Sequence, residues 1–351
     1  MVESGVESAE LGNDAVHHRR DLGVVTHVTT DGDCLVTGGD RLLRGRLHRF
    51  LFEVCESALA IGNPPRPRDI VSFSPEHRED DRMPRFEYRN VTPTPEAEKA
   101  YLAWIERLDE EFMNRDPEHR SNVVRDTLCE LYLGQAYDAR PTGASLATQA
   151  LFHGFDPRNA TLEPEYYGDA DPVRYGERKP LIWFWMMFDR SPAGLNHWLG
   201  FRVRAMLARH VFKHCGKNVK IFHGVEISFG YNLTVEDNCV IHKYVLLDDR
   251  GEIIIHEGSS ISDYANVYSH AHDLNDGMIV NNMRTEIGPR ARVTYHATVL
   301  SGVRVGEHAM VGSMGVASKP VEPFHIVAGI PAKTVKVKDI APEEARRAER
   351  T

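Results

Sequence analysis

Apolar residues in the last third of the chain recur with a period of six. Aliphatic side chains stand at Ile287, Val293, Val299, Val305 and Val311, with Ala317 as a weaker member. The same period occurs earlier, at Val219, Val225, Val235, Ile241, Leu247, Ile255, Ile261 and Val267. Neither an amphipathic helix nor an alternating strand has this period, which is typical of hexapeptide β-helix repeats. We therefore predict a triangular prism of short parallel strands whose aliphatic side chains point inward.

The period is interrupted between Val267 and Ile287. A regular coil of the prism has no spare length, so the segment Tyr268–Glu286 must protrude as a loop. Long loops on rigid scaffolds commonly carry function. We therefore look for the chemistry of the protein beside this segment.

Ahead of the prism, from Thr94 onward, the apolar positions follow a helical period. Thr94 can cap a helix that begins at Pro95. We predict a second helix over residues 122–137 and mostly irregular structure over residues 138–180. A third helix is expected to open at Ser191.

The segment of residues 190–220 is basic. Between Asp189 and Glu226 there is no acidic residue, but there are seven lysines and arginines. One interpretation is weak contact with an anionic membrane surface. The other is a helix that covers the open end of the prism, where apolar side chains and unpaired backbone would otherwise be exposed. We favour the second interpretation.

The N-terminal quarter has short apolar segments separated by glycine and aspartate turns, which favours a small β-barrel or sandwich. It loosely resembles a cold-shock-type OB barrel, but the aromatic platform of single-strand binders is not evident. A structural or partner-binding role is therefore favoured. The predicted divisions are an acidic tail (1–18), this β domain (19–93), a helical and irregular cap region (94–214), the prism (215–338), and a tail or short helix (339–351).

Composition and charge disfavour several classes of function and cellular location. The net charge of −9 disfavours bulk nucleic-acid binding. The five cysteines form no Cys-x-x-Cys pair and no metal-ligand spacing, which favours a reducing compartment. The acidic N-terminus shows no signal peptide, and the longest apolar run, residues 181–188, is too short to span a membrane. We expect a cytoplasmic protein.

Two histidines, His270 and His272, stand where the protruding loop begins. If this stretch is a strand, both side chains point the same way. Histidine is the natural general base near neutral pH. An isolated histidine is usually structural, but this position at the edge of the prism favours a catalytic role.

The repeats, the His-Ala-His-Asp loop and the closing phrase Val327–Lys333 together resemble the hexapeptide-repeat acyltransferases. The nearest subgroup is the maltose, galactoside and nodulation O-acetyltransferases, and the resemblance covers residues 215–338. It implies a left-handed parallel β-helix, a homotrimer, and acetyl-CoA as co-substrate. The expected reaction moves an acetyl group directly to a hydroxyl of a sugar or other small acceptor, with a histidine as general base.

The resemblance also assigns residues. The catalytic role falls on His272, with His270 as the second choice. The acyl-CoA wall of the family corresponds to Gly312, Ser313, Ser318, Lys319, Gly329, Pro331, Lys333 and Lys336. The lysines would meet the nucleotide phosphates as positive charge.

The coil expected to bind the acceptor differs from that of the sugar O-acetyltransferases, which carry an asparagine-rich coil before the catalytic one. Here that coil has Asp248 and Asp249, which either hold acceptor hydroxyls or simply turn the chain. In the loop, Asn275, Asn282 and Arg284 are suited to bind hydroxyls. The loop is expected to select the acceptor; the alternative is that it only packs on a neighbouring subunit.

Two other functions remain as alternatives. One is an inactive scaffold in which the prism serves assembly. The other is a zinc enzyme that resembles γ-class carbonic anhydrases, whose ligands include two histidines five residues apart. No two of the 18 histidines have that spacing, so no metal is expected.

Overall fold

The computed structural model describes residues 25–28, 34–37, 89–137 and 143–342. The chain divides into two units, residues 1–87 and 88–351. In the first unit, β1 (Val25–Val28) and β2 (Cys34–Thr37) form an antiparallel pair. The rest of the expected barrel, the acidic tail and most of segment 339–351 lie outside the described residues, so those expectations stay predictions.

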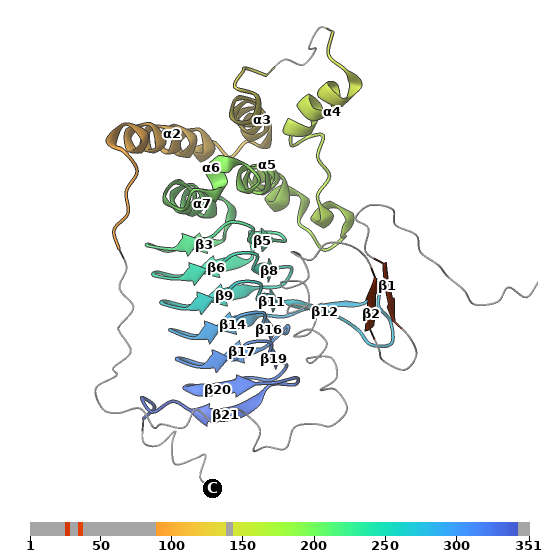
Figure 1. Cartoon of the computed structure of the whole chain (residues 1–351), viewed down its shortest axis with the longest axis vertical. Coiled ribbons are helices and arrows are strands. Elements are labelled where there is room, and N and C mark those ends of the chain that lie inside the picture. Colours follow the sequence, from red (N-terminus) through yellow and green to blue (C-terminus); the bar gives the residue numbers. More distant parts are fainter. Residues whose placement is uncertain (1–24, 29–33, 38–88, 138–142, 343–351) are drawn as a thin grey trace, which may run out of the picture. The chain divides into compact units, whose positions relative to one another are not determined.

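Residues 214–337 form a β-solenoid of three parallel sheets, and each coil adds a strand to each sheet (Figure 1). The first sheet holds β3 (His214–Cys215), β6 (Leu233–Val235), β9 (Ile253–Ile255), β14 (Thr285–Ile287) and β17 (Arg304–Val305). The second holds β4 (Lys220–Ile221), β7 (Val240–Ile241), β10 (Ser260–Ile261), β15 (Arg292–Val293), β18 (Met310–Val311), β20 (His325–Ala328) and the antiparallel β21 (Lys333–Val337). The third holds β5 (Glu226–Ile227), β8 (Leu246–Asp248), β11 (Asn266–Tyr268), β16 (Thr298–Val299) and β19 (Val316–Ala317).

The predicted inward positions are confirmed from the second coil onward. Val235, Ile255 and Ile287 stack in register, and each is fully buried. The phase of the first coil was wrong, because its inward strand positions are Cys215 and Ile221 rather than Val219 and Val225. Val219 and Val225 are also buried, but they stand four positions after inward residues, where small residues normally turn the corner. An aliphatic residue at that corner produced the mistaken phase.

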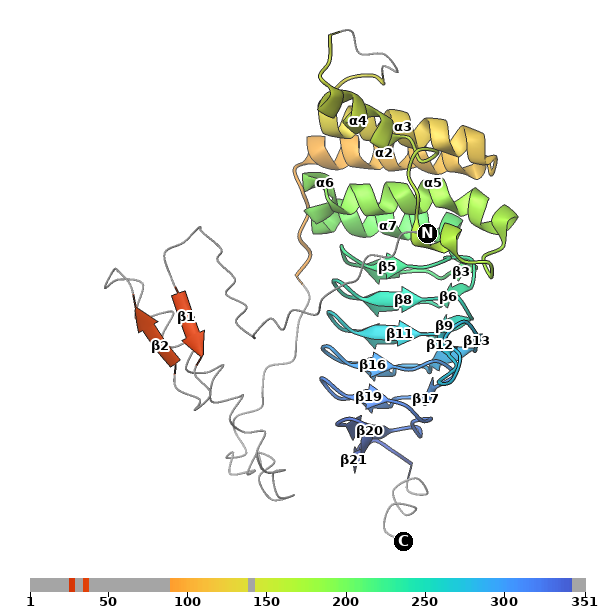
Figure 2. The same cartoon turned by 90° about the vertical axis from the view of Figure 1, so that its right-hand side faces the viewer.

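A layered helical cap precedes the prism. Its helices are α2 (Pro95–Met113), α3 (Pro117–Leu133), α4 (Leu146–Phe155), the 3₁₀ turn η2 (Glu163–Tyr166), α5 (Pro172–Asp189), α6 (Pro192–Leu195) and α7 (His197–Val211). The helices α5 and α7 lie next to the first coil, and α2 and α3 lie beyond them (Figure 2). As predicted, Thr94 caps α2, since its side chain accepts a hydrogen bond from the Ala97 amide. Within the described residues, no helix is long and apolar enough to cross a membrane.

Two expectations for this region were wrong. The stretch 138–180 is not mainly irregular, because it holds α4, η2 and the first half of α5. Pro180 hid α5 from the sequence pattern, yet it lies inside a helix that Asp171 caps. The helix expected from Ser191 is in fact two helices, because Asn196 ends α6 and caps α7.

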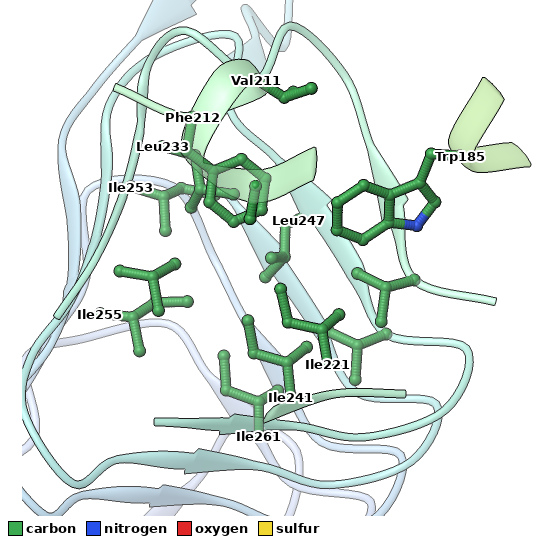
Figure 3. Packing of buried hydrophobic residues seen from close by; sticks show 14 of the residues in the cluster. Trp185, Val211, Phe212, Ile221, Leu233, Ile241, Leu247, Ile253, Ile255 and Ile261 are labelled. Atoms are coloured by element: carbon green, nitrogen blue, oxygen red, sulfur yellow. The ribbon is translucent and has the colours of Figure 1, made fainter. Parts of the chain in front are cut away.

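The cap closes the open end of the prism, as the favoured interpretation of the basic segment predicted. Helix α7 packs on β3 and β4. Val211, Phe212 and Trp185 lie at the cap end of the apolar core, beside Leu233 and Leu247, so that this end of the core is covered (Figure 3). Without this layer the side chains of the first coil would face water, at a cost of roughly 25 cal/mol for each Å² of apolar surface.

The basic residues of segment 190–220 are mostly engaged within the protein. Arg204 is buried, pairs with Asp189 at 2.7 Å, and donates to the carbonyl of Ile221 in the first coil. The other carboxylate oxygen of Asp189 accepts from the Gly224 amide at 2.8 Å. Arg209 pairs with Asp109, another residue of the cap. Because Arg204 is buried and paired, it cannot contact a membrane surface, so the structure favours the capping role.

The segment that interrupts the prism, residues 268–286, protrudes as predicted and forms a hairpin. Strand β12 (His270–His272) pairs antiparallel with β13 (Val280–Asn282). At its base the chain passes so close to Gly251 that a Cβ there would lie 2.5 Å from the Ser269 carbonyl oxygen. The hairpin is therefore held at a fixed place beside β8.

The ion pair between cap and prism gives a first prediction. Arg204→Ala would leave the buried Asp189 carboxylate without its cation, so unfolding free energy should fall by about 3–5 kcal/mol. Arg209→Ala, which breaks an exposed pair, should cost under about 1 kcal/mol. Chemical denaturation of both variants checks this, and equal losses would show that Arg204 does not hold the cap.

Candidate active site

The corner that leads from the third sheet to the first is enlarged in the coils nearest the cap. Ile227 and Val235, and again Leu247 and Ile255, are eight positions apart instead of six. In the next coil the hairpin leaves at the same corner. The regular spacing of six returns in the following coil. Extra backbone from three successive coils therefore gathers at one edge, beneath the cap.

At this edge His270 meets Asp248. Its Nδ1 is in contact with the Asp248 Oδ2 of the preceding coil, and the two side chains are only 17% and 6% exposed. The other carboxylate oxygen of Asp248 accepts a hydrogen bond from the Ser228 hydroxyl at 3.0 Å. A carboxylate beside Nδ1 favours the tautomer with its proton on that nitrogen, and Nε2 is then the atom that can accept a proton. An arrangement of this kind can orient a histidine as a general base.

His272 lies at the same site but in a different setting. Its side chain is exposed, and its Nδ1 is 2.6 Å from the Gly277 carbonyl oxygen within the hairpin. The rings of His270 and His272 are 5.5 Å apart and nearly perpendicular. Both histidines line one pocket. The structure thus brings the two candidates together, but it pairs His270 alone of the two with a carboxylate.

The neighbouring Asp249 turns the chain, which is one of the two roles the sequence left open. Its side chain is fully buried and accepts hydrogen bonds from the amides of Phe229 at 2.8 Å and Asn232 at 3.2 Å. Burial raises the pKa of Asp249 from 3.8 to about 6, against the opposing effect of these amides. No part of this carboxylate is exposed to an acceptor.

The pocket beside the histidines has a volume of about 480 Å³. Its outer wall comes from η2 and α5 of the cap, including Tyr175 and Trp185, and its floor comes from the third sheet, including Ile227 and Asp248. His270 borders it from the hairpin. A cavity of this size suits a small organic molecule.

A polar cluster ties the cap to the prism at the edge of the pocket. Arg250 donates to both oxygens of Asp169 in the cap, at 3.0–3.2 Å, and its guanidinium lies 4.3 Å from the centre of the Tyr167 ring. Asp169 also accepts from Asn282 of the hairpin at 3.1 Å. Burial alone would raise the pKa of Asp169, but these hydrogen bonds hold it below its usual value. Cap, prism and hairpin therefore meet at one carboxylate.

The three loop residues expected to bind the acceptor do not line the pocket. Asn282 is engaged by Asp169, and Arg284 pairs with Glu252 at 2.5 Å. Asn275 lies in the exposed tip, where its amide donates to Asp273. Sequence reasoning missed Tyr175, Trp185 and Asp169, because only the folding of the cap onto the prism brings the two aromatic residues to the pocket and Asp169 to Arg250.

Part of the expected CoA wall is assembled on the last coils. The Gly312 amide donates to the Val327 carbonyl at 2.7 Å, and a Cβ on Gly312 would crowd Ala328 at 3.2 Å. The Gly329 carbonyl accepts from Val316, and the bond before Pro331 is cis. Ser313 lies beside Thr294, their hydroxyls 3.3 Å apart.

The expected phosphate ligands are exposed on the same coils. Lys319 follows β19, Lys333 begins β21 opposite Ala328, and Lys336 pairs with Asp339 at 3.2 Å. Ser318 stands between β19 and Lys319. In the third sheet, β16 lies between β19 and β11, which leads into the hairpin, so these residues are displaced from His270 along the prism axis. Among the described residues, no three histidine, cysteine, aspartate or glutamate side chains form a group that could hold a metal.

The burial of Asp249 predicts a pH dependence of stability. An acid whose pKa is higher in the folded state keeps its proton more tightly there, so its contribution to unfolding free energy falls as pH rises from about 4 to about 6. Asp249→Asn should remove that fall while it keeps an acceptor for the Phe229 amide. Denaturation curves at several pH values measure this; an unchanged pH profile in the variant would contradict the assignment.

Comparison with known proteins agrees with this architecture. A serine acetyltransferase of Mycobacterium tuberculosis (strain ATCC 25618 / H37Rv) is 28% identical over 141 residues, which cover 40% of this chain and 56% of that enzyme. The chain thus spans little more than half of that relative. A dTDP-4-amino-4,6-dideoxy-D-glucose acyltransferase of Escherichia coli is 30% identical over 156 residues, covering 35% of this chain and 81% of that enzyme.

A hexapeptide-repeat acetyltransferase of Vibrio cholerae O1 biovar eltor, solved with acetyl coenzyme A, is 20% identical with a TM-score of 0.41. The match covers 45% of this chain and 86% of that one. No protein-family model matches the chain. On the strength of the match across most of the Escherichia coli enzyme, the chain belongs to the hexapeptide-repeat acyltransferases.

Proposed function

We propose that this protein transfers an acetyl group from acetyl-CoA directly to a hydroxyl of a small acceptor, with His270 as the general base. Family membership supports the reaction class. The observation that carries the proposal is the His270–Asp248 pair at the border of a pocket large enough for a small molecule. Left-handed winding of the solenoid, expected from the resemblance, is part of the same proposal.

In the proposed reaction, Nε2 of His270 removes the proton of the acceptor hydroxyl as the oxygen attacks the thioester carbonyl carbon. Collapse of the tetrahedral intermediate breaks the carbon–sulfur bond, and the leaving thiolate takes the proton from His270. Asp248 stabilises the imidazolium that forms between these steps and fixes the ring orientation. Ser228 in turn orients Asp248.

The sequence analysis favoured His272 as the general base, with His270 as the second choice. The present assignment reverses this order. A general base needs a fixed orientation and a partner that stabilises its protonated form. His270 has both through Asp248, whereas His272 is exposed and bonded to its own hairpin. We therefore place His272 at the entrance of the site, in contact with substrate but not with the transferred proton.

The donor is proposed to bind along the last coils. Gly312 and Gly329 allow the pantetheine arm to lie against the backbone there, and Lys319, Lys333 and Lys336 supply positive charge for the nucleotide phosphates. The thioester would extend along the third sheet toward His270. Donor and acceptor then approach the base from opposite ends of the prism.

The catalytic assignment predicts that three single variants lose activity to different degrees. His270→Ala should lower kcat by about 10²–10⁴ because it removes the base, and Asp248→Asn should cause a smaller loss. His272→Ala should mainly raise the acceptor KM. Thiol release from acetyl-CoA is the assay, and calorimetric CoA affinity is the control that should not change. An inactive His272→Ala beside an active His270→Ala would return the role to His272.

We also propose a homotrimer in which a neighbouring copy completes the CoA groove. Exposed aromatic side chains run down the corner between the second and third sheets, where Tyr244 and Tyr264 stack at 5.1 Å and Tyr264 and His296 at 4.9 Å. Tyr244 and Tyr264 remain 47% and 42% exposed in the single chain. A row of exposed rings along one corner is suited to contact with another subunit.

Tyr264→Glu should reduce the trimer to monomers, because a charge would be buried among the stacked rings. Leu146→Glu, which adds the same charge to an exposed position of the cap, should leave assembly intact. Light scattering at micromolar concentration reports the mass. A monomeric unmodified protein would refute the trimer, and a trimeric Tyr264→Glu variant would place the interface elsewhere.

A further inference from the structure

The pocket beside His270 is poorly suited to a sugar. Apolar side chains form the largest group in its lining: Leu162, Pro164, Ile182, Met186, Val225, Ile227, Phe229 and Leu246. Aromatic rings from the cap and from β11 add to this wall. The polar lining residues could pair with only part of a sugar's hydroxyls, and each hydroxyl held against the apolar wall would lose its hydration at a cost in free energy. The lining instead favours a mostly apolar molecule.

The charges of the lining argue against a phosphorylated acceptor. Glu163, Glu226 and Asp248 contribute carboxylates. Among the described residues that border the pocket, apart from the histidines, Arg250 is the cation, and Asp169 already neutralises it. A phosphate would meet net repulsion here. The nucleotide-linked amino sugar named for the Escherichia coli relative is therefore a poor match for this site.

Two buried hydrogen-bond donors line the same pocket without partners. Tyr175 is 4% exposed and Trp185 is 2% exposed. Neither the Tyr175 hydroxyl nor Trp185 Nε1 has a hydrogen-bond partner among the described residues. In Figure 3 the indole nitrogen of Trp185 lies on the side of the ring that faces away from the aliphatic core of the prism. Buried donors are rarely left unpaired, and a ligand is one way to satisfy them.

We infer that the acceptor is a neutral, mostly apolar alcohol that carries a second oxygen. Its apolar body fills the space between the cap and the third sheet. The second oxygen accepts hydrogen bonds from Tyr175 and Trp185, while the hydroxyl that is acylated lies at His270. This inference rests on the proposed function and names the substrate class of that site.

A matched pair of probes tests the second oxygen. In 4-(hydroxymethyl)acetophenone a carbonyl oxygen stands where 4-isopropylbenzyl alcohol has a methyl group, and the two are otherwise close in shape. The inference expects the ketone to bind more tightly, by about threefold to tenfold for one hydrogen bond. Calorimetry on the CoA-free full-length protein measures both affinities. Maltose and dTDP-glucose, tested in the same way, should bind more weakly than either.

Conservative variants separate recognition from folding. Tyr175→Phe and Trp185→Phe keep a ring but remove the unpaired donor, so each should reduce the preference for the ketone. Tyr175→Phe should not lower Tm, because removal of an unsatisfied buried donor does not destabilise the folded protein. Trp185→Phe also removes buried ring volume and should lower Tm, so its affinities are measured well below its melting temperature. Trp183→Phe is the matched control: its indole nitrogen is also buried without a partner in the described residues, but Trp183 does not line the pocket. It should leave both affinities unchanged.

The outcomes distinguish this inference from the reaction itself. If the ketone preference appears and Tyr175→Phe removes it, but no alcohol releases thiol from acetyl-CoA, the pocket assignment stands and the proposed function fails. If maltose or dTDP-glucose binds more tightly than the aromatic alcohols, the inference is overturned. The same holds if both aromatic variants keep the full ketone preference, even where acetyl transfer is observed.

Discussion

The structure depends on the burial of one aliphatic side chain per strand inside a narrow prism. Residues such as Ile241, Ile261 and Val293 stack in register and are wholly removed from water. This stacking stabilises each coil only through its neighbours, so the first coil exposes its apolar layer unless something covers it. The helical cap covers this layer. The way in which the cap is attached to the prism leaves the pocket between them.

Electrostatic contacts decide how the cap is attached. Hydrophobic burial alone is non-directional, but the Arg204–Asp189 pair binds backbone groups of the first coil on both sides. A second ion pair, between Arg250 of the prism and Asp169 of the cap, holds another edge of the cap. Between these two ion pairs the cap does not seal against the third sheet, and the space that remains is the pocket.

The candidate site follows from the enlarged corner of the prism. Asp248 follows Leu247 directly, where the enlarged corner begins, and its side chain contacts His270 of the next coil. The Asp248 carboxylate and the His270 ring thus come from parts of the chain that are 22 positions apart in sequence. Rigid coils above and below hold them in place, which suits a base that must keep one orientation.

From the sequence alone the prism and its interruption could be predicted, because a period of six is a local property that each coil repeats. The sequence also determined the cap of α2 at Thr94, since capping depends on neighbouring residues alone. It misplaced the first coil at Val219 and missed α5 around Pro180. The choice between His270 and His272 as general base stays a prediction, and what separates them in the structure is the contact of His270 with Asp248. Whether an aliphatic residue faces inward or turns a corner, and which histidine meets a carboxylate, depends on contacts between residues far apart in the chain, and no local pattern encodes those contacts.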